Sequence, residues 1–512
     1  MATSLAFFKA VRGRTVVALA SLALALAPAS APAQVPPDAA WRTLSTEHFR
    51  VTFPEHLEAL GRRAADRAER AWGRLSQEFL KPPAGRIDIL LTDHADVSNG
   101  FAHIRPSNRI TIYARPPADD PGLGYFDDWM ELVVTHELAH VFHLDRAGPL
   151  GRFLRGVFGR APAGWPFFPG VGVPRWTSEG LATWYESYFS EAGRVHGTYH
   201  DMIVRTAALE GRFERLDQAS GDSPEWPGGR RAYAYGSLFF DYLMEKHGTE
   251  RMGAFAEAVA GQWIPYRLDA AGRKAFGASL SEEWRLWTEE VAREAAAAKA
   301  RAELVGPLTR PEPFTKGARV ALHPRISRDG ASLAYAASDG RSDSEVRVRS
   351  AEGGAARAHH RTNGLATFDW LDGGRLLVSQ LELQGPYLTW GDLYEFEEAG
   401  GARRITSGAR LSQPSASPDG RWAVAVQDGG GTNALVKVDL ATGVLTALAP
   451  AHPDVHWSYP AVSPDGRWIA ASRWTPGAFL DVVVLDGAGQ IAVRVTEDRA
   501  LDLAPTWAPD GR

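Results

Sequence analysis

The sequence contains no cysteine. Disulfide bonds and a cysteine-borne lipid anchor are therefore excluded, and the stability of the protein must come from ordinary packed cores. A metal ion in this protein would have to be held by histidine and carboxylate side chains, because no thiolate is available.

Runs of one charge sign are also missing. The chain has 56 Lys and Arg residues against 61 Asp and Glu residues, which leaves a formal net charge of −5. Because no basic stretch is long enough to follow a phosphate backbone, nucleic acid is not an expected partner. Apolar residues make up 45% and charged residues 23% of the 512 residues, which argues for folded protein and against disorder. This length predicts two or more domains.

Long apolar runs are confined to the N-terminus. A basic region within residues 9–14 precedes an apolar run over residues 16–27, and Ala31-Pro32-Ala33 has the pattern of a signal peptidase site. We interpret residues 1–33 as a signal peptide and expect a periplasmic or secreted protein. The apolar run is short for a membrane-spanning helix, which favours cleavage near Ala33 over retention as an anchor. No transmembrane span is expected after cleavage.

Residues 34–304 mix strand and helix patterns, which predicts an α+β domain. Alternating apolar residues predict strands over 46–53, 87–92 and 110–114. Helical spacing is found over 55–79, 127–144, 177–189, 233–247 and 281–302. Either Asp127 or Asp128 is the expected N-cap of the second of these helices.

The stretch over residues 150–174 is rich in Gly, Pro, Phe and Arg. A connection of this length is unusual unless it covers a site or has a surface role. A lid, a membrane-surface contact and a packed loop are the alternatives, and the packed loop is the expectation.

After a proline-rich linker at 305–314, the sequence repeats. Asp-Gly turns begin at positions 329, 372, 419, 465 and 510, with spacings of 43, 47, 46 and 45 residues. A period of this length with several short strands is typical of propeller blades. The repeats over 315–512 resemble the Pro-Asp-Gly blades of TolB-like β-propellers. Because a propeller must close to hide its sheet edges, we expect further blades beyond these four or so repeats.

The motif His-Glu-Leu-Ala-His lies inside the predicted helix over 127–144. Its histidines, His136 and His140, are four residues apart, so one helix face presents both imidazoles to a single Zn²⁺. Glu137 need not bind the metal and can take a proton from the attacking water and pass it to the leaving amine. The pattern alone also fits a buried helix whose histidines are satisfied by other groups.

A second motif, Trp-Thr-Ser-Glu-Gly-Leu-Ala at 176–182, favours the metal site. With Thr177 or Ser178 as N-cap, its helix would present Glu179 near the first turn. A carboxylate there completes the two-histidine, one-glutamate set of a catalytic zinc ion, with a fourth position left for water. We therefore predict one zinc ion per catalytic domain, held by His136, His140 and Glu179.

The two motifs together resemble the gluzincin metallopeptidases of the peptidase MA-like type, which are related to aminopeptidase N-type enzymes. The resemblance covers about residues 41–302 and implies a zincin-like fold, the same three zinc ligands and Glu137 as general base. The gap of 39 residues between His140 and Glu179 is about twice that of aminopeptidase N-type enzymes, which favours an endopeptidase.

The segment 233–238 resembles the Tyr-x-x-Gly segment of that family, which implies that Tyr233 stabilises the oxyanion. The alternative is an aromatic stripe that packs the helix. Tyr235 is two residues further on, so it should point away from the metal.

Four neighbouring features are assigned other roles. We expect His143 to lie in the core or support a ligand, Asp145 to be a poorer third ligand than Glu179, and Glu186 to support a ligand or face solvent. The strand over 109–114 is a candidate edge strand for pairing with an extended peptide.

The leading hypothesis is zinc-dependent hydrolysis of a peptide or protein substrate. In this hypothesis the propeller is a platform for substrate or for a protein partner. The alternative is a non-catalytic binding or assembly protein that works through its propeller and uses the zincin-like domain as a scaffold.

Overall fold

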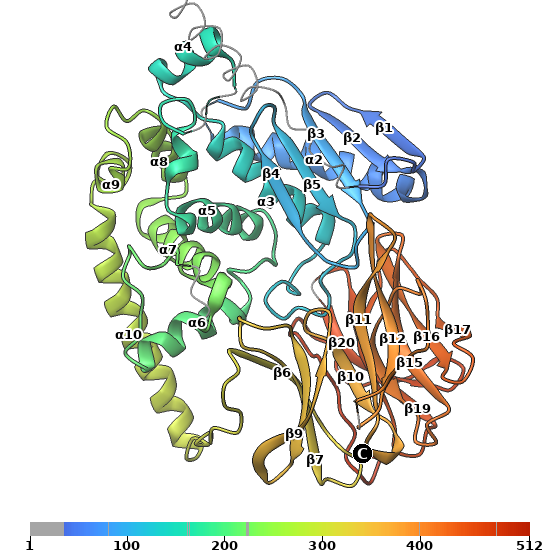
Figure 1. Ribbon diagram of the computed structural model, residues 1–512. Helices are drawn as coiled ribbons and strands as arrows, with labels where there is room; N and C mark the ends of the chain where they lie inside the picture. Colours follow the sequence, from blue (N-terminus) through green and yellow to red (C-terminus); the bar gives the residue numbers. More distant parts are fainter. Residues whose placement is uncertain are drawn as a thin grey trace, which may run out of the picture. The chain divides into compact units, whose positions relative to one another are not determined.

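The computed structural model describes residues 35–79, 81–160, 162, 164–221, 225–398, 400–477 and 479–511. The predicted signal peptide, residues 1–33, lies outside the described residues. The chain divides into two compact units, residues 1–38 and 39–512, and every element below belongs to the second unit. A helix-rich N-terminal region is followed by a β-propeller (Figure 1).

The N-terminal region contains one mixed five-stranded sheet. Its strands, in spatial order, are β1 (Trp41–Ser45), β2 (Phe49–Pro54), β3 (Ile87–Thr92), β5 (Arg109–Tyr113) and β4 (Gly100–His103). The central strands β2, β3 and β5 run parallel, and β4 pairs antiparallel with β5 at the edge. The prediction of an edge strand at 109–114 is therefore wrong, because β4 covers that strand. Residues 46–48, predicted as strand, form the turn between β1 and β2.

Helices form most of the region (Figure 1), and those at residues 58–78 and 129–144 contact this sheet. The helices of the region are α2 (Glu58–Glu78), α3 (Trp129–Leu144), α4 (Pro149–Phe158), α5 (Arg175–Tyr188), α6 (Thr198–Leu209), α7 (Arg231–His247), α8 (Arg251–Ala260), α9 (Leu268–Phe276) and α10 (Leu280–Val305), with short 3-10 turns η1 (Glu55–Leu57), η2 (Pro169–Gly172) and η3 (Gly228–Arg230). The stretch 150–174, predicted as a packed loop, contains α4 and η2. No helix among the described residues is long and apolar enough to cross a bilayer.

Helix α3 runs through the centre of the region. Fourteen of its sixteen residues are buried, all except Glu131 and Leu144, as expected for a helix that is apolar on most sides. Asp128 caps its N-terminus, accepting hydrogen bonds from the backbone N–H groups of Met130 and Glu131. The same carboxylate binds Arg63 and Arg67 of α2, so one aspartate both starts α3 and ties it to its neighbour.

Helices α5 and α7 cross in close backbone contact. A Cβ atom added to Gly180 would collide with the backbone of Gly236, and one added to Gly236 would collide with the carbonyl of Trp176. Two helices approach this closely only where neither carries a side chain at the crossing. Helix α5 begins at Arg175, so the predicted N-cap at Thr177 or Ser178 is wrong and Glu179 lies in the second turn.

The propeller consists of four antiparallel four-stranded blades. Their strands are β6 (Val320–Ile326), β7 (Ser332–Ser338), β8 (Glu345–Ser350), β9 (Gly353–Arg361); β10 (Thr367–Trp370), β11 (Leu376–Gln384), β12 (Leu388–Phe396), β13 (Ala402–Arg404); β14 (Leu411–Ala416), β15 (Trp422–Gly429), β16 (Thr432–Asp439), β17 (Leu445–Ala449); β18 (His456–Val462), β19 (Trp468–Thr475), β20 (Phe479–Asp486) and β21 (Ile491–Arg494). The first four Asp-Gly turns each join the first two strands of a blade, so they recur at equivalent positions. Their glycines have φ between 66° and 74°, which explains the glycine at each turn.

The propeller contacts the N-terminal region through the segment that precedes α3. Arg115 is buried between Asp119 of that segment and Asp428 of β15, at 2.7 and 3.0 Å. Gln413 of β14 donates a hydrogen bond to the same Asp119 carboxylate. Arg115 and Asp428 pair across the contact, so separating the two parts would leave each of these buried charges without that partner.

We predict that Gly180→Ala destabilises the protein by about 1–3 kcal/mol or more, because the new methyl group forces α5 and α7 apart. Gly73→Ala is the matched control: Gly73 lies on the exposed side of α2, where an added Cβ meets nothing within 4 Å. It should be neutral or stabilising by roughly 0.5–1 kcal/mol. Thermal unfolding of the two variants measures both effects, and equal melting temperatures would contradict the described crossing.

Candidate metal centre

Three side chains from α3 and α5 meet at one point. The Oε2 atom of Glu179 lies 3.2 Å from Nε2 of His140 and 3.6 Å from Nε2 of His136. One ligand atom from each residue lies within 4.8 Å of the other two. The structure thus brings together the three residues that the sequence selects, although they come from helices separated by α4 and η2.

The donor set fits a zinc ion. Ligands that share one zinc ion at about 2.0–2.2 Å in tetrahedral geometry lie roughly 3.3–3.6 Å apart, close to the separations observed here. Both histidines are buried, and Glu179 is largely so. Two imidazoles and a carboxylate without sulfur also match the zinc chemistry expected of a chain without cysteine.

A second carboxylate orients His136. Glu186, seven residues after Glu179 on α5, has Oε2 at 3.1 Å from Nδ1 of His136. A proton on Nδ1 donated to Glu186 leaves Nε2 facing Glu179, where a ligand lone pair is needed. Burial opposes a charge on His136, but its hydrogen bonds to Glu179 and Glu186 raise its pKa to about 9. The pocket thus favours positive charge between two carboxylates, and a metal cation would supply it.

Arg194 holds Glu186 in place, and the sequence reading did not identify it. Its guanidinium binds both carboxylate oxygens at 2.7 and 2.9 Å, and its Nη2 atom lies 3.1 Å from Nδ1 of His136. Burial would raise the pKa of Glu186, but this pairing lowers it to about 2. No motif marks Arg194, because it lies in the connection after α5 and reaches the site only through folding.

Glu137 is buried beside the two histidines, and its carboxylate is not one of the three converging donors. Burial raises the pKa of its carboxyl group above the usual value, and the nearby histidines oppose that shift. The edge strand β4 passes directly over it: a Cβ atom added to Gly100 would lie 2.7 Å from Oε1 of Glu137. The absence of a side chain at Gly100 therefore provides the space that the Glu137 carboxylate occupies.

The two tyrosines of α7 point in different directions. The ring of Tyr233 stacks near that of His136, with centroids 6.3 Å apart, and its hydroxyl lies 3.5 Å from Nη2 of Arg175. Tyr235 is buried, stacks on Trp284, and accepts a hydrogen bond from the backbone N–H of Glu214. Tyr233 thus lies at the metal centre, and Tyr235 does not.

The remaining candidates lie away from the donor cluster. His143 is fully buried, and burial lowers its pKa to about 3, so it stays neutral in the core. Asp145 binds Arg155 and Arg160 at 2.9 and 2.8 Å, so it anchors the start of the 150–174 stretch.

A cavity of about 730 Å³ opens over the metal centre. Its lining includes both histidines, Glu137, Glu179, Tyr233 and residues 100–103 of β4. Asp120 and Arg230, paired at 2.7 Å, close one side. The Asp120–Arg230 pair was also missed by the sequence reading, since the two residues are far apart in the chain.

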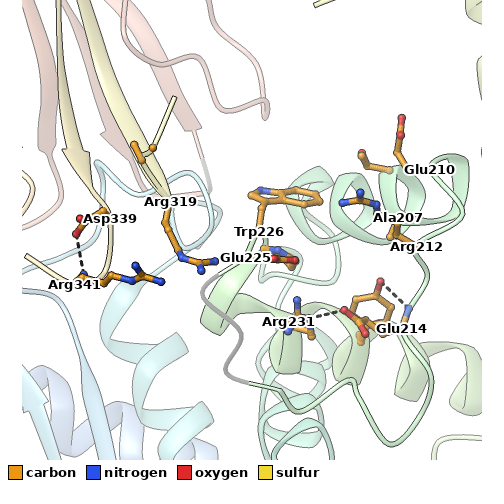
Figure 2. Close-up of a pocket in the computed structure, with 15 residues that line it drawn as sticks. Ala207, Glu210, Arg212, Glu214, Glu225, Trp226, Arg231, Arg319, Asp339 and Arg341 are labelled. Atoms are coloured by element: carbon orange, nitrogen blue, oxygen red, sulfur yellow. Dashed lines mark hydrogen bonds and ion pairs between the residues drawn. The ribbon is translucent and has the colours of Figure 1, made fainter. Parts of the chain in front are cut away.

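A second cavity, of about 820 Å³, adjoins the first, and Pro227 borders both. It lies between helices α6 and α7 and the first propeller blade. Figure 2 shows the side chains of Arg319 and Arg341, from the blade, extending toward Glu225 and Trp226 on the opposite side.

The chain matches no known family model. A protein from Treponema pallidum described as uncharacterized is 25% identical over 246 residues, which are 47% of this chain and 21% of that protein. A TolB homologue from Chlorobium chlorochromatii is 30% identical over 99 residues, 19% of this chain and 21% of the homologue. The chain thus spans about a fifth of the length of these curated relatives.

Solved structures overlap with the chain over about a third of its length. A protein described as TolB from Agrobacterium tumefaciens has 23% identity and a TM-score of 0.33, covering 38% of this chain and 74% of that chain. TolB from Acinetobacter baumannii has 18% identity and a TM-score of 0.30, covering 38% and 47%. With the four blades, the sequence similarity to a TolB homologue confirms a TolB-like β-propeller. The gluzincin resemblance of residues 41–302 stays a prediction.

We predict that the purified protein binds one zinc ion per chain and that His140→Ala loses it, because two of the three donors cannot hold the ion tightly. Glu137→Gln is the matched control, since it changes the neighbouring residue of α3 without removing a donor. Elemental analysis after dialysis measures both. Full zinc content in His140→Ala would place the ion elsewhere.

Proposed function

We propose that the protein is an exported zinc-dependent peptidase, most simply an endopeptidase, that hydrolyses peptide bonds in a protein or peptide substrate. The observation that carries this proposal is the meeting of His136, His140 and Glu179 beside a buried glutamate, at the base of an open cavity. The predicted signal peptide supports export.

Zinc bound by these three side chains would polarise the substrate carbonyl and lower the pKa of a water molecule toward neutrality. Glu137 then accepts a proton from that water and donates it to the leaving amine. Its burial favours this exchange, because burial raises the pKa of the carboxyl group and so makes the carboxylate a stronger proton acceptor.

Two further groups act on the substrate. The hydroxyl of Tyr233 donates a hydrogen bond to the carbonyl oxygen as negative charge develops there, and the neighbouring guanidinium of Arg175 favours that charge. The edge strand β4 lines the cavity, and we propose that an extended peptide pairs with its outer edge and presents one of its bonds to the metal.

The second candidate is a non-catalytic binding or assembly protein that uses its propeller to hold a protein partner. The similarity to a TolB homologue favours this reading, and the comparisons support it better than they support a peptidase. The two candidates differ in one observable respect. A scaffold would bind zinc without turning over any unfolded protein, whereas a peptidase would cut it.

We predict that Glu137→Gln retains the fold and the zinc ion but loses nearly all hydrolysis of casein, because an amide cannot accept the proton from water. Zinc content and thermal unfolding serve as internal controls. Turnover by Glu137→Gln at the wild-type rate would remove the proposed general base.

We predict that Tyr233→Phe lowers the turnover number with little change in KM, zinc content or stability, because an oxyanion donor acts mainly in the transition state. The loss should be roughly tenfold to a hundredfold, equivalent to a few kcal/mol at most. Tyr235→Phe is the matched control on the same helix and should leave turnover close to that of the wild type. The reverse ranking would contradict the proposed role of Tyr233.

A further inference from the structure

Large apolar side chains are exposed on the segments that follow α3 and α8. They are Phe153, Val157 and Phe158 of α4, Val171 of η2, and Trp263, Ile264 and Tyr266 of the connection between α8 and α9, and each is between 47% and 75% exposed. We call these seven residues the apolar patch. Single exposed apolar residues need no explanation, but seven large ones on neighbouring segments mark an interaction surface.

The segments of the apolar patch lie against one another. The backbone N–H of Gly148, just before α4, donates to the carbonyl of Ala260 at 2.9 Å. The indole of Trp165 donates to the carbonyl of Gln262 at 3.1 Å, and the ring of Tyr266 fills the space above Gly172. Figure 1 shows α4 at the outer end of the helix-rich region, at the top of the view, with α8 below it. The three segments that carry the patch therefore adjoin one another.

The segments that carry the apolar patch contain arginine but no acidic residue. The sequence has no Asp or Glu between Asp145 and Glu179, and none between Glu257 and Asp269. Arginines occur in both stretches, and Arg152 and Arg267 are exposed beside the patch. The chain as a whole is acidic, with a net charge of −5, so this local composition is unusual. An anionic partner is favoured electrostatically.

The helix α4 is amphipathic in the manner of helices that lie in a membrane interface. Its buried side rests on the protein through Gly151, while Phe153, Val157 and Phe158 face outward between arginines. Aromatic side chains settle at the level of lipid headgroups, and arginines bind the phosphates there. The tryptophan and tyrosine of the 263–266 connection add the same kind of contact.

We infer that the apolar patch docks this protein onto the surface of a membrane that contains anionic phospholipids. The inserted groups are the aromatic and aliphatic side chains of the patch, and Arg152 and Arg267 contact the headgroups. Docking of this kind needs no membrane-spanning helix. It is also independent of any hydrolytic activity, because none of these side chains touches the donor cluster.

The absence of cysteine allows a direct test on the full chain. Val157→Cys introduces a single thiol for an environment-sensitive fluorophore, and Leu383→Cys does the same on the propeller strand β11, where Leu383 is 75% exposed. Each labelled protein is mixed with vesicles of phosphatidylcholine, with or without phosphatidylglycerol. We expect the emission at position 157 to rise and shift to the blue with the anionic vesicles, and the emission at 383 to stay unchanged.

Further changes separate the outcomes. Phe158→Ser and Trp263→Ser are then added to the protein labelled at position 157. Its affinity for the anionic vesicles should fall by roughly tenfold or more, since each change removes an inserted apolar side chain. Thermal unfolding should not change, because these side chains are exposed. An aqueous spectrum at position 157 while the protein sediments with vesicles would overturn the inference, and so would an equal response to neutral vesicles. A blue shift that grows with protein concentration alone would identify a second copy of the chain as the occupant instead.

Discussion

The close crossing of α5 and α7 at Gly180 and Gly236 is the constraint on which the metal centre depends. One residue before Gly180 stands Glu179, and three residues before Gly236 stands Tyr233. Because the two backbones touch at the crossing, both side chains are held at fixed depth beside α3. The two glycines allow the helices to meet. They therefore also set the positions of the Glu179 carboxylate on α5 and the Tyr233 hydroxyl on α7.

The charged groups at the site form a continuous series of pairs. Arg194 pairs with Glu186, Glu186 orients His136, and His136 with His140 faces Glu179. Burying so many ionisable groups costs free energy unless each has a partner. A second series of buried charges connects Arg115 with Asp428 of the propeller, and the adjoining Asp120 pairs with Arg230 at the cavity wall. The propeller thus contacts the segment that forms one side of the site.

Local patterns predicted the parts of the fold that depend on local chemistry. The helix predicted over 127–144 is observed at 129–144, and Asp128 is its cap, one of the two aspartates that the sequence left open. The strand at 87–92 and the repeated Asp-Gly turns also follow from spacing and side-chain type. Glu179 could be selected because its motif has its own helix. The edge strand β4 could not be predicted from the sequence, because only four residues form it and its place depends on pairing with β5. Arg194 carries no local signal, since its role arises from a contact across the fold. The stretch over 150–174 was misread because its Gly and Pro content concealed the ten-residue helix α4.

Whether the donor cluster performs hydrolysis is the central question, and one measurement addresses it directly. The zinc-loaded protein is incubated with a peptide library in isotopically labelled water, and the products are identified by mass spectrometry, with and without a chelator. The proposed mechanism predicts cleavage of internal peptide bonds, one labelled oxygen in each new carboxyl group, loss of cleavage with the chelator and recovery on adding zinc. A protein with one zinc ion at His136, His140 and Glu179 that cuts no peptide would contradict the proposal and favour a binding role.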